Sequence, residues 1–218
     1  MLKRNALIAG ATGLVGSSLL RQLSENDVYE KILVLTRKPV DISNPKLIQH
    51  QIDFDQLESF RTDVRVDDVF CALGTTIKTA GSKDAFCKVD HDYVLSLGNW
   101  SAANAVQRFL VVSAMGADTG SWVFYNRVKG KMEKSVSRLN IPQIQVFRPA
   151  LLMGNRAEKR AGEKMAQVVF EGLGFLFAGP LLKYKGIHAD VVAGAMIKCA
   201  ANDAKGFKIF ESGEMQRM

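Results

Sequence analysis

The chain has 218 residues, of which 47% are hydrophobic and 23% are charged, as is ordinary for a soluble globular protein. Its formal net charge is +7, but the basic residues are scattered without interleaved aromatics, which argues against a nucleic-acid partner and for a solvated surface with a small anionic ligand. The three cysteines have no metal-ligand spacing, which predicts free thiols, no metal site and a cytoplasmic location. No window reaches the roughly 18 to 20 apolar residues of a membrane span, so we expect no membrane segment.

Short apolar runs alternate with helical patterns along the chain. The runs predict strands at residues 5–10, 31–37, 47–53, 68–74, 108–114, 143–150 and 207–212. The patterns between them predict helices at about 14–24, 55–61, 83–104, 121–139, 162–176 and 189–202. This alternation predicts an α/β fold with a doubly wound parallel sheet, the Rossmann fold. We expect one domain over residues 1–218, with 155–188 as a small C-terminal cap on the substrate side.

The first predicted strand runs into GATGLVG, where three glycines recur at a three-residue interval as strand becomes helix. Glycines at this point permit a tight turn, let backbone N–H groups approach a pyrophosphate and let the helix pack closely on the sheet. The position after a first strand favours dinucleotide binding over an ordinary glycine-rich loop. The predicted cofactor-binding residues of this turn are Gly10, Thr12, Gly13, Leu14, Val15 and Gly16.

The end of the second predicted strand bears on the choice of cofactor. A carboxylate there accepts from the adenosine 2′-hydroxyl of NAD, whereas basic residues accommodate the 2′-phosphate of NADP. The sequence LTRKP offers Arg37 and Lys38, with no acid before Asp41, so we favour NADP over NAD; the alternative is that both bases are surface residues. After the third strand, Asp53 is expected to accept from the adenine amino group and Phe54 to wall the ring.

The fourth predicted strand ends in CALGTT, which is rich in small residues. Small residues at this edge let the backbone pass beside a bound nucleotide. We therefore add Ala72, Leu73 and Gly74 to the expected cofactor-binding residues.

A tyrosine and a lysine stand four positions apart in the helical stretch FYNRVKGKME. The helical period puts Tyr125 and Lys129 on one face, where the ammonium favours loss of the phenolic proton. The fifth strand ends at Ser113, and the carboxyl ends of parallel strands form the ligand crevice. Near a hydride carrier, the serine would orient a carbonyl or hydroxyl, the tyrosine would transfer the proton, and the lysine would activate the tyrosine and hold the ribose. Without the glycine turn and the serine, the alternative would be that Tyr125 and Lys129 simply lie on a solvent-exposed helix surface, where such pairs are common.

Taken together, the segments GATGLVG, LTRKP, CALGTT, FLVVSAMGA, YNRVK, VFRPALLMG and HADVVAGAM resemble the short-chain dehydrogenase/reductase superfamily over essentially the whole chain. KVDHDYV, SAMGAD and FRPALLMGNRAEKRAGE bring it closer to the atypical, epimerase-like group that contains the Tat-interacting oxidoreductase. The resemblance implies a Rossmann fold, NADPH binding and a catalytic set of Ser113, Tyr125 and Lys129. It also implies that Arg148 and Pro149 lie beside the nicotinamide.

The chain departs from its larger relatives at two points. Larger epimerase-like enzymes carry asparagine in the helix before the fifth strand, where this chain has Asp90, and an ionised acid cannot donate as an amide does. The substrate-binding part after the sixth strand is also short. Within it, Arg156 and Arg160 either receive an anionic substrate group or belong to a solvated charged loop. We expect Asp190 to cap the last long helix.

The function that these features favour is an NADPH-dependent oxidoreductase acting on a small-molecule carbonyl or alcohol. One alternative is an epimerase or dehydratase with a retained cofactor. Another is an NADP-sensing protein that interacts with a protein partner and turns over little, because a fold does not fix a function. The sequence leaves the substrate, the reaction direction and the oligomeric state open.

Overall fold

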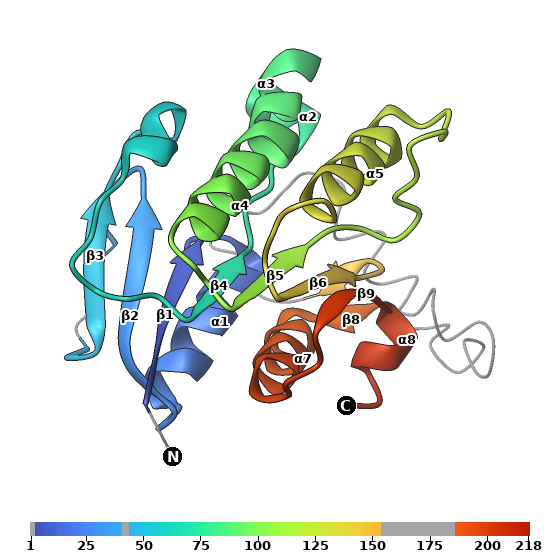
Figure 1. Ribbon diagram of the computed structural model, residues 1–218. Helices are drawn as coiled ribbons and strands as arrows, with labels where there is room; N and C mark the ends of the chain where they lie inside the picture. Colours follow the sequence, from blue (N-terminus) through green and yellow to red (C-terminus); the bar gives the residue numbers. More distant parts are fainter. Residues whose placement is uncertain (1–2, 41–43, 154–185) are drawn as a thin grey trace.

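The computed structural model describes residues 3–40, 44–153 and 186–218. Seven parallel strands form one sheet in the order β3-β2-β1-β4-β5-β6-β9 (Figure 1). Their bounds are β1 Arg4–Ala9, β2 Tyr29–Thr36, β3 Leu47–Gln51, β4 Asp68–Cys71, β5 Arg108–Val112, β6 Gln143–Arg148 and β9 Gly206–Glu211. The order reverses between β1 and β4, and this switch point is where a doubly wound sheet opens its ligand crevice. The predicted Rossmann fold is confirmed.

Helices cover both faces of the sheet. The α-helices are α1 Leu14–Glu25, α2 Ile77–Ala80, α3 Lys83–Cys87, α4 Tyr93–Ala103, α5 Phe124–Val136, α7 Ala189–Ala201 and α8 Ser212–Met215. Phe54–Ser59 (η1) is a 3-10 helix and Lys88–Asp92 (η2) is a π-helical turn that joins α3 to α4. A small second sheet pairs β7 Leu152–Met153 with β8 Ile187–His188. In Figure 1, α1 and α7 lie on one face of the large sheet, and α4 and α5 lie on the other.

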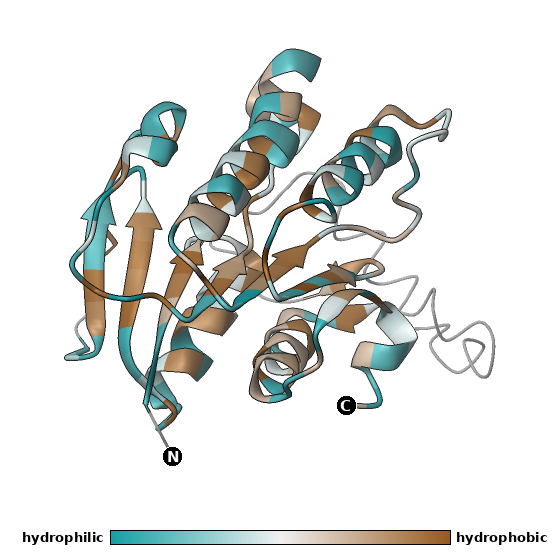
Figure 2. Ribbon diagram, in the orientation of Figure 1, coloured by the Kyte–Doolittle hydropathy of each residue, from teal (hydrophilic) through white to brown (hydrophobic). Residues whose placement is uncertain are grey.

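The apolar runs of the sequence become strands that are buried on both faces. Along β1, Ala6 and Ile8 pack into the core beneath α1 and α7, whereas Leu7 and Ala9 pack into the core beneath α4 and α5. The period of two along a strand produces this division. Figure 2 shows the result as a hydrophobic sheet between helices with hydrophilic outer faces. Two cores therefore hold the carboxyl ends of the strands rigidly at one edge.

The predicted elements match the structure with local differences. The helix expected at 83–104 contains the π-helical turn η2, which shifts the register of its side chains around Asp90. The helix expected at 121–139 begins at Phe124 and ends at Val136. The helix expected at 162–176, the cap at 155–188, and Arg156 and Arg160 lie outside the described residues. Within the described residues, no helix is long and apolar enough to cross a membrane.

The prediction that Asp190 caps α7 is wrong. The N-cap residue of α7 is His188, which makes no capping hydrogen bond through its side chain. Asp190 lies in the first turn of the helix, and its carboxylate accepts hydrogen bonds from Ser18 and Arg21 of α1. The packing of α1 on α7 supplies these partners from a helix that is far away in sequence.

Candidate active site

The glycine turn lies against the end of β4. Gly10 has φ +89°, and a Cβ built on it would lie 2.5 Å from the carbonyl oxygen of Ala72. A Cβ on Gly16 would lie 1.9 Å from the carbonyl oxygen of Gly10. Only glycine fits at these two positions, because one needs the left-handed conformation and both lack room for a side chain. The turn thus brings the start of α1 directly beside Ala72.

The amino end of α1 has no partner from its own side chains. Its N-cap is Gly13, so no N-cap side chain can accept from the first backbone N–H groups, and its first turn holds no acid. The first N–H groups of a helix have no acceptor within the helix, and they carry the positive end of its dipole. Thr12 and Gly13 are exposed at this point. The arrangement can bind an anion such as a pyrophosphate through backbone N–H groups.

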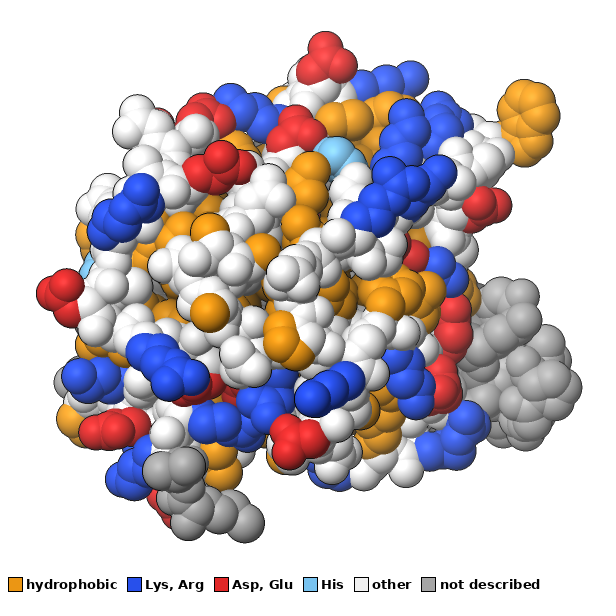
Figure 3. All heavy atoms as spheres, in the orientation of Figure 1, with side chains coloured by type: hydrophobic (Ala, Val, Ile, Leu, Met, Phe, Trp, Pro, Cys, Tyr) orange, Lys and Arg blue, Asp and Glu red, His pale blue; other side chains and the backbone are white. Residues whose placement is uncertain are grey.

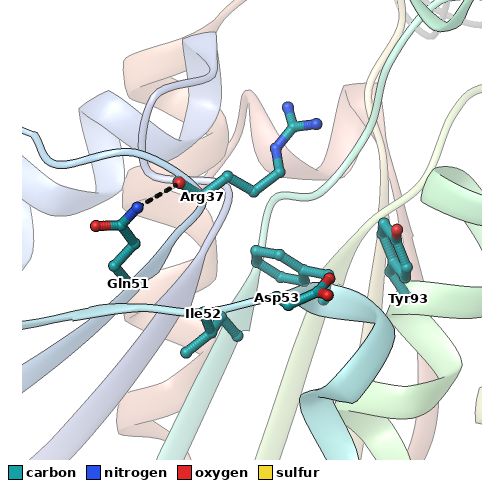
Figure 4. Close-up of a pocket in the computed structure, with 6 residues that line it drawn as sticks. Arg37, Gln51, Ile52, Asp53 and Tyr93 are labelled. Carbon is teal, nitrogen blue, oxygen red and sulfur yellow. Dashed lines mark hydrogen bonds between the residues drawn. The ribbon is translucent and has the colours of Figure 1, made fainter.

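A cavity of about 530 Å³ opens beyond the ends of β2 and β3. It is lined by Arg37, Gln51, Ile52, Asp53, Phe54 and Tyr93. The Gln51 amide donates to the carbonyl oxygen of Arg37 at 3.2 Å, and Figure 4 shows the Arg37 side chain extending past the strand end towards the side of the cavity where Asp53 and Tyr93 lie. Among the described residues, no carboxylate forms an ion pair with this guanidinium. Lys38 is exposed and does not line the cavity.

The other predicted residues of this region have local partners. The Asp53 carboxylate accepts from the backbone N–H of Asp55 at 2.9 Å and so caps η1. The Phe54 ring is buried and packs on Tyr93, with ring centroids 5.5 Å apart. Tyr93 was missed from the sequence, because its role depends on how α4 packs on η1. The hydroxyl of Thr36 was missed as well: it is buried at the end of β2 and has no hydrogen-bond partner among the described residues.

Lys129 reaches the end of β4 from α5. Its ammonium is buried and forms an ion pair with Asp90, with 2.8 Å between Nζ and Oδ1. The other carboxylate oxygen of Asp90 accepts from the backbone N–H of Thr75 at 2.8 Å. A Cβ on Gly74 would lie 3.8 Å from the Lys129 Nζ. Burial acts to lower the pKa of Lys129, but the charge of Asp90, the phenol of Tyr125 and the hydrogen bond to Asp90 outweigh it and raise that pKa above its usual value.

Tyr125 lies one turn before Lys129 on the same face of α5. It is partly buried, and its ring packs on Phe86 with centroids 5.5 Å apart. Phe86 is fully buried in α3, immediately before the turn that carries Asp90. The structure therefore brings together the predicted residues Tyr125, Lys129 and Gly74, and adds Asp90 to them.

The Ser113 hydroxyl does not point towards Tyr125, as the predicted catalytic set would require. Its hydroxyl donates to Oε1 of Glu133 at 2.5 Å, inside the protein. Glu133 also binds the guanidinium of Arg148, at 2.6 Å and 2.9 Å, and Arg148 reaches Glu211 at 3.2 Å. Glu133 was missed from the sequence, although its place four residues after Lys129 is on the buried face of α5. Ser113 and Arg148 thus meet through Glu133, and the hydroxyl is turned to this acid instead of to Tyr125.

The loop after β6 completes this side of the site. The carbonyl oxygen of Pro149 accepts from the backbone N–H of Met115 at 3.0 Å, which ties the ends of β5 and β6 together. Glu133 and Arg148 also line a second cavity of about 630 Å³, between α5 and the edge strand β9. On the face shown in Figure 3, acidic and basic side chains lie mainly towards the margin, and uncharged and hydrophobic atoms cover most of the middle.

Comparison with known proteins gives one family match and two groups of relatives. Residues 6–217 match the model of the NAD dependent epimerase/dehydratase family. Protein HTATIP2 of Rattus norvegicus is 33% identical over 177 residues, which cover 79% of this chain and 73% of that protein. The mitochondrial protein FMP52 of Eremothecium gossypii is 30% identical over 217 residues, which cover 97% of this chain and 95% of that protein.

Solved structures share the fold at low sequence identity. UDP-glucose 4-epimerase from Thermotoga maritima, solved with UDP-glucose, has a TM-score of 0.71 and is 19% identical; the match covers 96% of this chain and 77% of that one. The enzyme WbmH of Bordetella bronchiseptica, solved with NAD+, has a TM-score of 0.73 and is 15% identical, with 97% and 76% of the two chains covered. Both likenesses are to longer chains and concern the fold.

Proposed function

Because this chain belongs to the NAD-dependent epimerase/dehydratase family, we propose that it is an NADPH-dependent oxidoreductase that acts on a small-molecule carbonyl or alcohol. The observation that carries the proposal is the segment 72–74 after β4. A Cβ built on Gly10 would lie 2.5 Å from the carbonyl oxygen of Ala72, and a Cβ built on Gly74 would lie 3.8 Å from the Lys129 Nζ. Three residues span at most about 10 Å. An extended nucleotide bound at the turn would therefore have its far end beside Tyr125 and Lys129.

The chain's own groups fit a dinucleotide with a 2′-phosphate. The start of α1, whose N-cap is glycine, suits the pyrophosphate, and the Arg37 guanidinium, which forms no ion pair with the described residues, suits the phosphate on the adenosine ribose. The buried Thr36 hydroxyl at the same strand end has no hydrogen-bond partner among the described residues. When bound, the nicotinamide would supply or accept the hydride. The residues that we propose to hold the cofactor are those of the glycine turn, Thr36, Arg37, Asp53, Phe54 and the segment 72–74.

In the proposed reaction, Tyr125 transfers a proton between its phenol and the substrate oxygen. Lys129 holds a positive charge beside that phenol and cannot move away, because its stem is buried and its ammonium is paired. Ser113 would have to turn its hydroxyl away from Glu133 before it could bind the substrate oxygen. The proposal therefore depends on Tyr125 and Lys129 first, and on Ser113 second.

The test is replacement of Tyr125 by phenylalanine. NADPH binding, followed by its fluorescence, should persist, and turnover of a carbonyl panel should fall about 100-fold or more, as when a general acid is removed. Trp122→Phe is the matched control, because Trp122 is three residues away and 99% exposed. Unchanged turnover in Tyr125→Phe would refute the mechanism, and absence of nucleotide binding in the wild type would refute the cofactor.

A second candidate is a nucleotide-sensing protein that binds a protein partner in the cytoplasm. The contact between Ser113 and Glu133 favours it, because a hydroxyl engaged in the interior does not orient a substrate. Capture of a partner from lysate with NADP+ and with NADPH would separate the two candidates. A sensor would change partners with the redox state and show no carbonyl turnover, whereas a retained nucleotide without net redox turnover would indicate an epimerase or dehydratase.

A further inference from the structure

Asp90 lies in the middle of the π-helical turn η2, with only 1% of its surface exposed. A carboxylate at this depth is costly unless charge and hydrogen bonds compensate it. Both of its oxygens are used: one faces the Lys129 ammonium at 2.8 Å and the other accepts from the Thr75 N–H at 2.8 Å. A π-helical turn inserts an extra residue into a helix and often occurs at functional sites. Here it places the acid where α5 meets the end of β4.

The other titratable groups around this pair are neutral or exposed. Burial raises the pKa of the Cys71 thiol of β4 to about 12, so this thiol carries no charge at neutral pH. Burial, with the charges of nearby acids, also raises the pKa of the Cys87 thiol of α3. Asp84 and Asp92 are exposed. From α5, Lys129 contacts the acid at 2.8 Å, and Tyr125 acts on the same Lys129 ammonium, so the phenol lies near a buried ion pair.

We propose that Asp90 is a positioning residue that neutralises Lys129 and thereby keeps Tyr125 in its protonated, proton-donating form around neutral pH. The inference rests on the proposed oxidoreductase function. A lone ammonium beside a phenol favours the phenolate, but a carboxylate at 2.8 Å cancels most of that field. An asparagine at this place would have nearly the same size but no charge to cancel that field.

A protonated Tyr125 suits carbonyl reduction. In that direction the carbonyl carbon gains a hydride from NADPH, which becomes NADP+, and the carbonyl oxygen gains the phenolic proton of Tyr125. The phenolate then recovers a proton from water, so one solvent proton is consumed in each turnover. Alcohol oxidation needs the phenolate as base. Because the Lys129–Asp90 pair is neutral as a whole, the site is adapted to the reducing direction at neutral pH.

The test is Asp90→Asn, which keeps the side-chain size and an acceptor for Thr75 but removes the negative charge. Loss of the negative charge at 2.8 Å from the Lys129 ammonium leaves a net positive charge there, which favours loss of a proton from the site at lower pH, whichever group releases it. The alkaline limb of kcat/KM for carbonyl reduction should move down by about one pH unit or more. The appearance of tyrosinate absorbance should move with it, and the double variant with Tyr125→Phe should lose this signal.

Asp92→Asn is the matched control, because Asp92 is exposed, two residues away, and pairs with His91 instead of Lys129. It should leave both the rate profile and the tyrosinate titration in place. If Asp90→Asn lowered the melting temperature but moved neither profile, Asp90 would be a purely structural residue and the proposal would be overturned.

Two further measurements keep the proposal testable if Asp90→Asn does not fold. Asp90→Glu retains the charge and should retain the wild-type profile. The wild type itself should show constant carbonyl reduction through neutral pH and tyrosinate only at alkaline pH, so a phenolate at neutral pH in the wild type would also overturn the proposal. The tyrosinate titration needs no turnover, which separates failure of this inference from failure of the oxidoreductase function.

Discussion

Buried charges differ between the two ends of the strands, which we call the amino edge and the carboxyl edge of the sheet. Strand β4 runs from one to the other. At its amino end, Asp68 is completely buried and has three partners: Arg4 at 3.1 Å, Arg108 at 3.0 Å and the Tyr29 phenol at 2.7 Å. Burial raises the pKa of Asp68, and the hydrogen bond from Tyr29 and the two guanidinium charges offset only part of that rise. Burial and the Asp68 charge also raise the pKa of Tyr29. This set is closed.

At the carboxyl edge, several charged or polar groups have few or no partners among the described residues. Asp90 near the end of β4 has one cation, and that cation has a titratable phenol as its other neighbour. Arg37 pairs with no carboxylate of the described residues, and the start of α1 has no cap. The difference teaches that burial alone does not mark a functional charge. What marks the candidate site, within the part of the chain that the structure describes, is the capacity to bind an anion: the Arg37 guanidinium forms no ion pair, and no N-cap side chain covers the start of α1.

The largest effect is expected at the closed edge. Asp68→Asn leaves Arg4 and Arg108 without their shared carboxylate, and breaking a buried ion pair lowers the free energy of unfolding by about 3–5 kcal/mol. Urea denaturation would measure the loss, with Asp63→Asn as the exposed control. NADPH affinity of the folded fraction should not change, because the whole length of β4 separates Asp68 from the segment 72–74. A large change in affinity would contradict the division between the two edges.

The fold and half of the candidate site could be predicted from local sequence. Apolar runs and a glycine turn report burial and backbone conformation, which are properties of a few neighbouring residues. The meeting of Lys129 with Gly74 follows from topology, since carboxyl ends of parallel strands share one edge. The prediction that Tyr125 and Lys129 lie near the end of β4 therefore followed from the predicted fold.

The partners of individual side chains could not be predicted in this way. The Ser113 hydroxyl donates to Glu133, a partner twenty residues away in sequence, which meets it only because α5 packs over the end of β5. The π-helical turn that directs Asp90 inward has no local signature in KVDHDYV. Asp190 likewise binds α1 because of the packing between two helices that are far apart in sequence. Such choices are settled by tertiary distances of a few tenths of an ångström.

A smaller effect is expected at the open edge. Arg37→Ala removes a charge-assisted hydrogen bond to the proposed 2′-phosphate, which is worth about 1.5–3 kcal/mol, or roughly a 10- to 100-fold rise in the Kd of NADPH. The Kd of NADH should stay the same, because NADH lacks that phosphate. Lys38→Ala should have the weaker effect of the two, since Lys38 does not line the cavity. Equal losses for both nucleotides would show that Arg37 does not read the phosphate.

The smallest effect is expected at Asp190. It tests whether a charged group contributes to stability because it is paired or because of the edge at which it lies. Asp190 lies at the carboxyl edge, yet its carboxylate is paired: the hydrogen bond from Ser18, followed by that from Arg21, lowers its pKa. A carboxyl group with a lowered pKa stabilises the fold above its unfolded pKa of about 3.9, and this contribution disappears as the pH falls through the folded pKa. The side chain is 65% exposed, so solvent screening limits the contribution to less than about 1 kcal/mol.

Urea denaturation should therefore show Asp190→Asn slightly less stable than the wild type at neutral pH, and the difference should disappear only as the pH falls through the lowered folded pKa of Asp190. A gap that persisted in acid would mean that packing, and not the carboxylate charge, joins α1 to α7. NADPH affinity should not change in this variant, even though the glycine turn lies at the amino-terminal end of the same helix α1. If the expected pattern holds, a paired charge at the carboxyl edge behaves as Asp68 does at the amino edge. Pairing, then, rather than position, separates the structural charges of this protein from those available to a ligand.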